Sequence, residues 1–296
     1  MYTRITVDGC IPAGNIVVDS IADELIRVHQ DLRDTEGDWF YWKFRVCGAA
    51  GKEIRIEFTK SEAVGTRGPA ISLDKGITWQ WLGREATVER KRFSYFIPNC
   101  IAEAWFCFCI PYLEVDLQRW LAQQSANSRL RRETLCLSRQ GRPVELLRVF
   151  SALPWPRFCV ALSCRHHCCE AMANFALEGF LDAALADDDL GRWYAQNAEV
   201  IAIPFVDKDG VEAGDQGKNR KPRDHGRDYQ GESIYPETAA IRQLFCLLVS
   251  AAAKPSPWIC IAPGSTASIT NGFIKWAGNC RADGKNNAVS DQFSNA

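Results

Sequence analysis

The chain has 296 residues, 47% of them hydrophobic, which is enough apolar sequence for a full core and favours two domains over one. Thirty-five lysines and arginines oppose 36 aspartates and glutamates, so the formal net charge is −1. Without a positive excess, neither a nucleic acid nor an anionic membrane is expected as a partner. The N-terminal stretch MYTRITVDGC lacks the apolar core of a signal peptide, so we expect a soluble, cytoplasmic protein.

The cysteines are expected to be reduced core residues rather than disulfides. There are 13 of them, an odd number, and the sequence contains no C-x-x-C pair. Most lie in apolar runs such as WFCFCIPY, where a free thiol behaves as a small hydrophobic group.

The N-terminal part, from residue 15 to about 112, alternates apolar and polar side chains in short runs. In KEIRIEFTK, Ile54, Ile56 and Phe58 share one face, which is typical of a strand with one buried side. The pattern returns in WFYWKFRVCG, ITWQWLG, RFSYFIP and EAWFCFCIP, all rich in aromatic residues. We therefore predict an antiparallel β-sandwich in residues 1–114.

The rest of the chain, residues 115–296, is predicted to be an α/β domain with a mixed central sheet. It opens with a helical segment at PYLEVDLQRWLAQQ, followed by a hairpin with Gly141 at its turn. RFCVALSC and EVIAIPFVD are continuous apolar runs, as expected for strands buried on both faces. A helix is predicted over PETAAIRQLFCLLVSA, with Pro236 near its first turn.

A helix is also predicted over EAMANFALEGFLDAALA, directly after the first of these buried strands. Its spacing places four apolar side chains on one face, which we expect to be buried. They are Met172, Phe175, Ala176 and Phe180.

The corner between that strand and that helix, SCRHHCCE, carries several reactive side chains. His167 and Glu170 have H-x-x-E spacing, which lets an imidazole and a carboxylate converge on one ion such as zinc. The alternative is a solvated helix N-terminus, at which the Glu170 carboxylate favours the helix dipole. Cys168 and Cys169 are further candidates, as thiolate ligands or as a nucleophile.

A long loop, KDGVEAGDQGKNRKPRDHGRDYQGESIYPET, follows the second buried strand, and long loops in compact domains are often functional. Together, RHHCCE and IPFVDKDGVEAGDQGKNR...DHGRDY resemble the zinc carboxypeptidase superfamily. Within it, the sequence is most similar to the cytosolic carboxypeptidase-like branch and its bacterial relatives. GDWFYWKFRV, ITWQWLG and FCIPYLEVDLQRWL are similar to the β-sandwich that precedes the catalytic domain in that branch, so the resemblance extends to about residue 260.

The resemblance implies a role for each of five residues. His167 and Glu170 would be zinc ligands, and Asp224 would be the carboxylate that orients the ligand histidine. Arg220 would polarise the scissile carbonyl, and Arg227 would pair with the terminal carboxylate of a peptide or protein substrate. The implied activity is hydrolysis of C-terminal residues, with a zinc ion activating the attacking water.

Three departures from the family pattern bear on this activity. Pro255 stands where the family has its third ligand histidine, and a substitute from Cys260, Ser256 or His225 is unsupported by spacing. Gly226 replaces an asparagine that helps to grip the substrate carboxylate. The family also has a catalytic glutamate near the end of the domain, whereas this chain has no glutamate after Glu237.

Two functions therefore stay open. One is a zinc carboxypeptidase whose missing groups come from other positions. The other is a catalytically impaired or inactive relative that binds peptide C-termini through Arg220 and Arg227.

Overall fold

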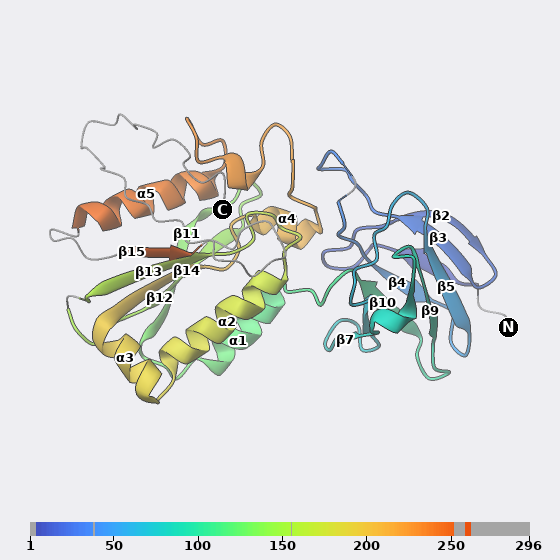
Figure 1. Cartoon of the computed structure of the whole chain (residues 1–296), viewed down its shortest axis with the longest axis horizontal. Helices are drawn as coiled ribbons and strands as arrows, with labels where there is room; N and C mark the ends of the chain where they lie inside the picture. The colour runs from blue at the N-terminus through green and yellow to red at the C-terminus, as the bar shows by residue number, and fades with distance from the viewer. Residues whose placement is uncertain (1–3, 38, 155, 252–257, 262–296) are drawn as a thin grey trace, which may run out of the picture.

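The computed structural model describes residues 4–37, 39–154, 156–251 and 258–261. Strands from the first hundred residues gather at one end of the molecule, and a sheet flanked by helices forms the other (Figure 1). The fold class predicted from the sequence, a β-sandwich followed by an α/β part with a mixed sheet, is confirmed.

The N-terminal part consists of two five-stranded sheets. In order, the first contains β1 (Thr6–Asp8), β4 (Lys43–Cys47), β10 (Glu103–Cys107), β6 (Ala70–Ser72) and β7 (Gln80–Trp81). The second contains β2 (Val17–Ala22), β3 (Leu25–His29), β5 (Glu53–Phe58), β9 (Arg92–Phe96) and β8 (Thr87–Val88). A short 3-10 helix, η1 (Arg84–Ala86), precedes β8.

Aromatic side chains from both sheets fill the space between them. Trp42 and Phe44 meet Phe58, Phe93 and Phe106 with ring centroids 4.9 to 6.0 Å apart. The predicted alternation of β5 is confirmed, since its three apolar side chains are buried and face this core. One detail is wrong: β3 and β5 pair in parallel, so the sandwich is not purely antiparallel.

The C-terminal part is built on a third sheet with both parallel and antiparallel pairs. Its order is β11 (Leu130–Leu137), β12 (Pro143–Val149), β14 (Ala198–Ile203), β13 (Phe158–Ser163) and β15 (Trp258–Ile261). β13 pairs in parallel with β14 and β15, whereas β12 is antiparallel to β11 and β14. β13 therefore lies inside the sheet. The segment with His167 and Glu170, here called the H-x-x-E corner, follows its carboxyl end.

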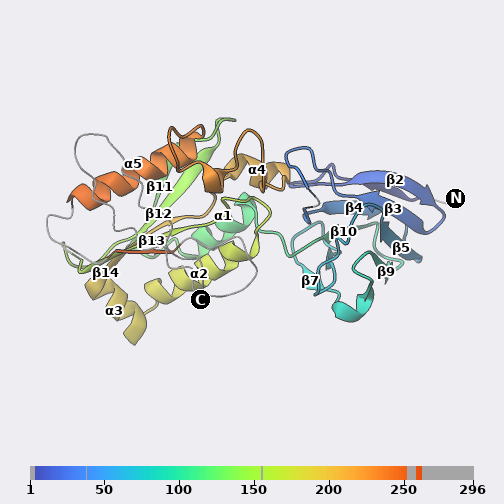
Figure 2. The same cartoon turned by 45° about the horizontal axis from the view of Figure 1, so that its top comes forward.

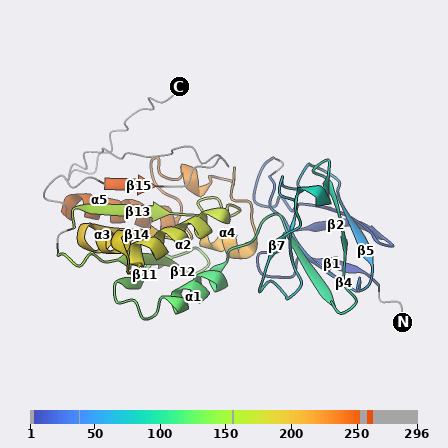
Figure 3. The ribbon, with the colours of Figure 1, turned by 60° about the horizontal axis from the view of Figure 1, so that its bottom comes forward.

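Helices cover both faces of this sheet. α1 (Glu114–Gln123) and α2 (Met172–Leu185) pack on one face with α3 (Asp189–Asn197) beside them, and these three come to the front in Figure 3. α5 (Pro236–Ala251) packs on the other face through Ile241. Figure 2 shows this helix on the side of the sheet opposite α1 and α2. α4 (Lys208–Ala213) and the short η2 (His225–Arg227) follow β14.

The predicted buried face of α2 is wrong. Met172 is 47% exposed and Phe175 is 36% exposed, whereas Leu177 and Leu181 are buried against the sheet. The buried stripe also includes Asn174, whose amide donates to the Pro204 carbonyl oxygen at 2.8 Å. The prediction used apolar side chains alone. Because a polar residue, Asn174, occupies part of the buried face, that criterion selected the wrong face of α2.

Six cysteines of the described part are buried free thiols: Cys107, Cys109, Cys159, Cys164, Cys168 and Cys169. Among the described residues, no helix is both long enough and apolar enough to cross a membrane.

Candidate functional site

The corner that carries His167 and Glu170 lies between the end of β13 and the start of α2. Arg165 has a left-handed backbone, with φ of 61°, and its buried guanidinium ties the corner together. The guanidinium donates to the Cys168 carbonyl oxygen (2.8 Å), the Tyr112 carbonyl oxygen (2.9 Å) and Asn174 Oδ1 (3.0 Å). These bonds fix the turn that presents His167.

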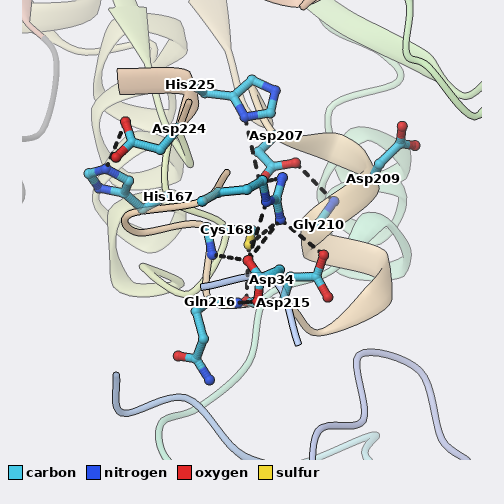
Figure 4. Close-up of polar contacts among 12 residues, drawn as sticks. Asp34, His167, Cys168, Asp207, Asp209, Gly210, Asp215, Gln216, Asp224 and His225 are labelled. Carbon is cyan, nitrogen blue, oxygen red and sulfur yellow. Dashed lines mark hydrogen bonds and ion pairs between the residues drawn. The ribbon is translucent and has the colours of Figure 1, made fainter. Parts of the chain in front are cut away.

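The imidazole of His167 has a carboxylate on each side. Its Nδ1 lies 3.4 Å from Glu170 Oε1, and its Nε2 lies 3.8 Å from Asp224 Oδ1. Figure 4 shows Asp224, the residue directly before η2, facing the ring. Burial opposes the charged imidazole, but the two carboxylates outweigh it and raise the pKa of His167. Burial also opposes ionisation of Glu170, yet His167 and Lys218 lower the pKa of that carboxyl.

Lys218 is a site residue that sequence reasoning missed. Its Nζ lies 2.6 Å from Glu170 Oε1 and 3.5 Å from His167 Nδ1, and 5.4 Å from the centroid of the Trp39 ring. A lysine two positions before Arg220 gave no sign in the sequence of where its side chain would point. In the structure, its ammonium group stands where the two predicted zinc ligands converge.

The residues present fit part of a zinc site. The imidazole Nδ1 and the Glu170 carboxylate are suitable donors, and they face a point that already attracts a cation, the Lys218 ammonium. Nε2 faces Asp224, the arrangement that holds a metal-binding imidazole in one orientation. A third donor is not found, because no three His, Cys, Asp or Glu side chains of the described residues form a group that could hold a metal. Pro255 and Ser256 lie outside those residues.

The other substitutes considered for the third ligand lie elsewhere. His225 has Asp207 and Glu237 on its two ring nitrogens, each at 3.8 Å, and all three side chains are buried. Cys260 pairs with Ala161 within the parallel β13–β15 ladder. Neither residue joins His167 and Glu170.

Burial argues against the two cysteines of the corner as thiolates. Cys168 is 1% exposed and Cys169 is 2% exposed. Burial raises the pKa of Cys169 to about 12 and that of Cys168 well above the ordinary value of 9.0. Both thiols are therefore neutral near pH 7, which is unsuitable for a nucleophile.

Arg220 is engaged by three carboxylates. Its guanidinium lies 2.7 Å from Asp207 Oδ2, 3.0 Å from Asp215 Oδ2 and 3.2 Å from Asp34 Oδ2. It also reaches Cys168 Sγ at 3.7 Å, beside the H-x-x-E corner. Burial opposes its charge, but the carboxylates, Asp207 foremost, raise its pKa.

A cavity of about 170 Å³ lies on the Arg220 side of the corner. Its lining includes Asp207, Arg220, His225 and Glu237, but His167 does not line it. Asp224 and Arg227 do not line it either.

Arg227 differs from Arg220 in being open to solvent. Its side chain is 71% exposed, and its Nε lies 3.7 Å from Asp224 Oδ2. A β-carbon at the neighbouring Gly226 would lie 3.4 Å from both His167 Nε2 and Asp224 Oδ1. An asparagine at Gly226 would therefore touch the imidazole, so the glycine leaves open space beside His167.

Asp228 anchors the segment between η2 and α5. Its fully buried carboxylate accepts hydrogen bonds from the backbone of Ile234 and Tyr235, each at 3.0 Å, and from the Thr238 hydroxyl. Burial opposes ionisation, but the Thr238 hydroxyl and the two backbone bonds lower the pKa of Asp228 below its usual 3.8.

We expect Asp228→Asn to lower the free energy of unfolding by about 1–3 kcal/mol near pH 7, because hydrogen bonds to a buried charge are lost. Since the folded pKa is lowered, this stability is present above the usual pKa and is lost as pH falls through the folded value. Urea unfolding at about pH 7 and about pH 3 measures it. A difference between wild type and variant that grows on acidification would contradict the expectation.

Comparison with known proteins places this arrangement in context. The chain is 23% identical over 177 residues to cytosolic carboxypeptidase 2 of Xenopus tropicalis, covering 53% of this chain and 18% of that protein. It is 23% identical over 223 residues to cytosolic carboxypeptidase 3 of Mus musculus, covering 64% and 22%. The chain thus spans about a fifth of the length of these curated relatives. No family model matches the sequence.

Solved structures of similar fold are also carboxypeptidases by name. A metallo-carboxypeptidase from Burkholderia cenocepacia superposes with a TM-score of 0.71 at 20% identity, covering 83% of this chain and 67% of that one. A metallo-carboxypeptidase from Pseudomonas aeruginosa, in complex with (2-guanidinoethylmercapto)succinic acid, gives 0.71 at 20% identity, covering 87% and 68%. The chain therefore shares its fold with these two metallo-carboxypeptidases over most of its length. The predicted resemblance is confirmed: the chain is similar in sequence to cytosolic carboxypeptidases and in fold to bacterial metallo-carboxypeptidases.

Proposed function

We propose that the protein is a metallocarboxypeptidase that engages the free C-terminus of a peptide or protein and hydrolyses its last peptide bond. The observation that carries this proposal is the two-sided environment of His167, with Nδ1 turned to Glu170 and Nε2 turned to Asp224. The names of the curated relatives support the same activity and a cytosolic location, and we propose both for this chain.

His167 Nδ1 and Glu170 would hold a zinc ion, which when bound supplies a Lewis acid that activates water for attack on the peptide carbonyl. Asp224 would hold the imidazole in one orientation and increase its basicity. The Lys218 ammonium would have to leave Glu170 for an ion to bind there, since both occupy the same side of that carboxylate.

The two arginines would act on the substrate. Arg227, exposed beside Asp224, would pair with the terminal carboxylate in a bidentate manner. Arg220 would stabilise negative charge that develops on the scissile carbonyl oxygen. This role requires one of its N–H groups to turn from the carboxylates that now surround it.

A peptide assay with matched ends tests the proposal. The purified chain, dialysed against trace zinc, is incubated with two peptides that differ only in a free or an amidated C-terminus, and released amino acids are measured. The proposal predicts zinc-dependent release from the free end alone. Equal release from both peptides, or release unaffected by a chelator, would refute it.

A second function is favoured by the state of the predicted ligands. The resemblance places Pro255 at the position of a ligand histidine, and Lys218 is bound to Glu170, one of the two other predicted ligands. These observations favour a peptide C-terminus binding module with impaired hydrolysis. Saturable binding of the free-ended peptide without release of amino acid would select this function over the first.

Arg227→Ala is expected to raise the dissociation constant for the free-ended peptide about 10- to 100-fold. The reason is the loss of a charge-assisted hydrogen bond, on the order of 1.5–3 kcal/mol. Fluorescence anisotropy measures the effect. Lys221→Ala is the matched control, because Lys221 is an equally exposed cation of the same loop at 72% exposure. An identical effect of Arg227→Ala on the amidated peptide would rule out the carboxylate contact.

A further inference from the structure

Asp34 belongs to the segment that leaves β3 of the sandwich, yet its partners all lie in the loop after α4. Asp34 Oδ1 accepts from the Gln216 backbone N–H at 3.0 Å, and Oδ2 accepts from the Gly217 N–H at 2.8 Å. Arg220 Nε donates to the same Oδ2 at 3.2 Å. The carboxylate is 9% exposed, so these bonds are shielded from water. Figure 4 shows Asp34 between Cys168 and Gln216.

Neighbours of Asp34 bind the same loop. The Gln216 side chain is fully buried and forms a pair of hydrogen bonds with the Tyr41 backbone, accepting from its N–H at 2.9 Å and donating to its carbonyl oxygen at 2.7 Å. The Thr35 hydroxyl donates to the Lys218 carbonyl oxygen, and Thr35 forms a β-bridge with Arg220. The sandwich therefore binds each residue from Gln216 to Arg220 except Asn219.

On its other side, this loop packs directly on the H-x-x-E corner. Gly217 has φ of 76°, and a β-carbon there would lie 2.6 Å from the Cys168 backbone nitrogen and 3.1 Å from His167 Cα. The loop is thus held between the two parts of the molecule with no room to shift toward the corner. Its position decides where the side chains of Lys218 and Arg220 stand relative to His167.

We propose that Asp34 is a positioning residue of the peptide site: it holds residues 216–220 against the H-x-x-E corner, so that the sandwich completes a site whose other residues lie in the α/β part. Asp34 does not touch the predicted ligands. It acts through Gly217 and Arg220, and the effect on peptide binding rests on the function proposed above.

The test combines amide hydrogen exchange with peptide affinity in the 296-residue chain. Asp34→Ala removes all three contacts, and Asp34→Asn keeps the shape while removing the charge that faces Arg220. Asp19→Ala is the control, because Asp19 is also a hydrogen-bonded carboxylate of this part of the chain, but its partners, the His29 and Thr59 side chains, lie within the sandwich. Exchange is read at the Gln216 and Gly217 amides, the two donors to Asp34.

We expect these two amides to exchange at least about tenfold faster in Asp34→Ala, with a smaller increase in Asp34→Asn and none in Asp19→Ala. The dissociation constant for the free-ended peptide should rise at least about fivefold in Asp34→Ala, while Asp19→Ala leaves it unchanged. Exchange within twofold of wild type would overturn the proposal. Faster exchange with unchanged peptide affinity would also overturn it, and would leave Asp34 as a clamp between domains. If the wild type binds no free-ended peptide, the proposed function fails, whereas exchange alone still decides whether Asp34 holds the loop.

Discussion

Replacing His167 with alanine is expected to lower the affinity for zinc by more than about 100-fold and to reduce peptide hydrolysis to background. Removing an outer partner of a metal-bound histidine already costs about 10- to 100-fold in affinity, so removing the ligand itself should cost more. With three ligands as the norm for catalytic zinc, the loss of one of two convergent donors would leave Glu170 alone with Lys218. Zinc affinity is measured by competition with a chromophoric chelator.

The wild type is itself expected to hold zinc weakly and to turn over slowly, because the resemblance places Pro255 at the position of the third ligand and two donors are fewer than a catalytic zinc site needs. His29→Ala is the control, since His29 lies in the sandwich and pairs with Asp19 at 2.9 Å. Asp224→Asn should lower the affinity for zinc by about 10- to 100-fold, which is less than the effect of His167→Ala. Unaltered zinc affinity in His167→Ala would show that the ion binds elsewhere.

Lys208→Ala is expected to lower the free energy of unfolding by about 3–5 kcal/mol, because it leaves a buried carboxylate without its main partner. Lys208 is fully buried in α4, and its Nζ lies 2.8 Å from both oxygens of Glu145, which is 1% exposed. Arg132, 3.1 Å from Glu145, keeps part of the compensation, so the lower end of the range is expected.

A double variant separates the contribution of the Lys208–Glu145 ion pair to stability from that of the packing around it. Lys208→Met combined with Glu145→Leu replaces two buried charges by apolar side chains of similar volume, and should recover most of the lost stability. Arg192→Ala is the surface control, expected within about 0.5 kcal/mol of wild type because its ion pairs are exposed. Urea unfolding gives all values. A loss below about 1 kcal/mol in Lys208→Ala would contradict the expected cost of the isolated carboxylate.

The sequence predicts the strands well where apolar and polar side chains alternate, and where the side chains on both faces are apolar. β5 and β13 lie where the patterns of Ile54 and of RFCVALSC place them, and Gly141 adopts the left-handed conformation, with φ of 76°, that its turn requires. The prediction of which face of α2 is buried failed, because Asn174 occupies a core position and two large apolar residues face solvent. The division into domains 1–114 and 115–296 stays a prediction.

For the site, the H-x-x-E spacing predicted that His167 and Glu170 lie close together, because only two residues separate them. The contact of His167 with Asp224 depended on the family resemblance, since 57 positions separate them and no local pattern relates β13 to the loop after β14. Lys218 and Asp34 were missed for a physical reason. Their positions follow from how the sandwich binds the loop, and long-range hydrogen bonds leave no periodic signal in a sequence.

Crystals grown or soaked with zinc, with diffraction recorded on both sides of the zinc absorption edge, test the central claim most directly. We expect one anomalous peak at bonding distance from His167 Nδ1 and a Glu170 oxygen, with the Lys218 ammonium displaced and Asp224 still facing Nε2. A zinc peak remote from His167, or an unchanged Lys218–Glu170 pair at saturating zinc, would contradict it.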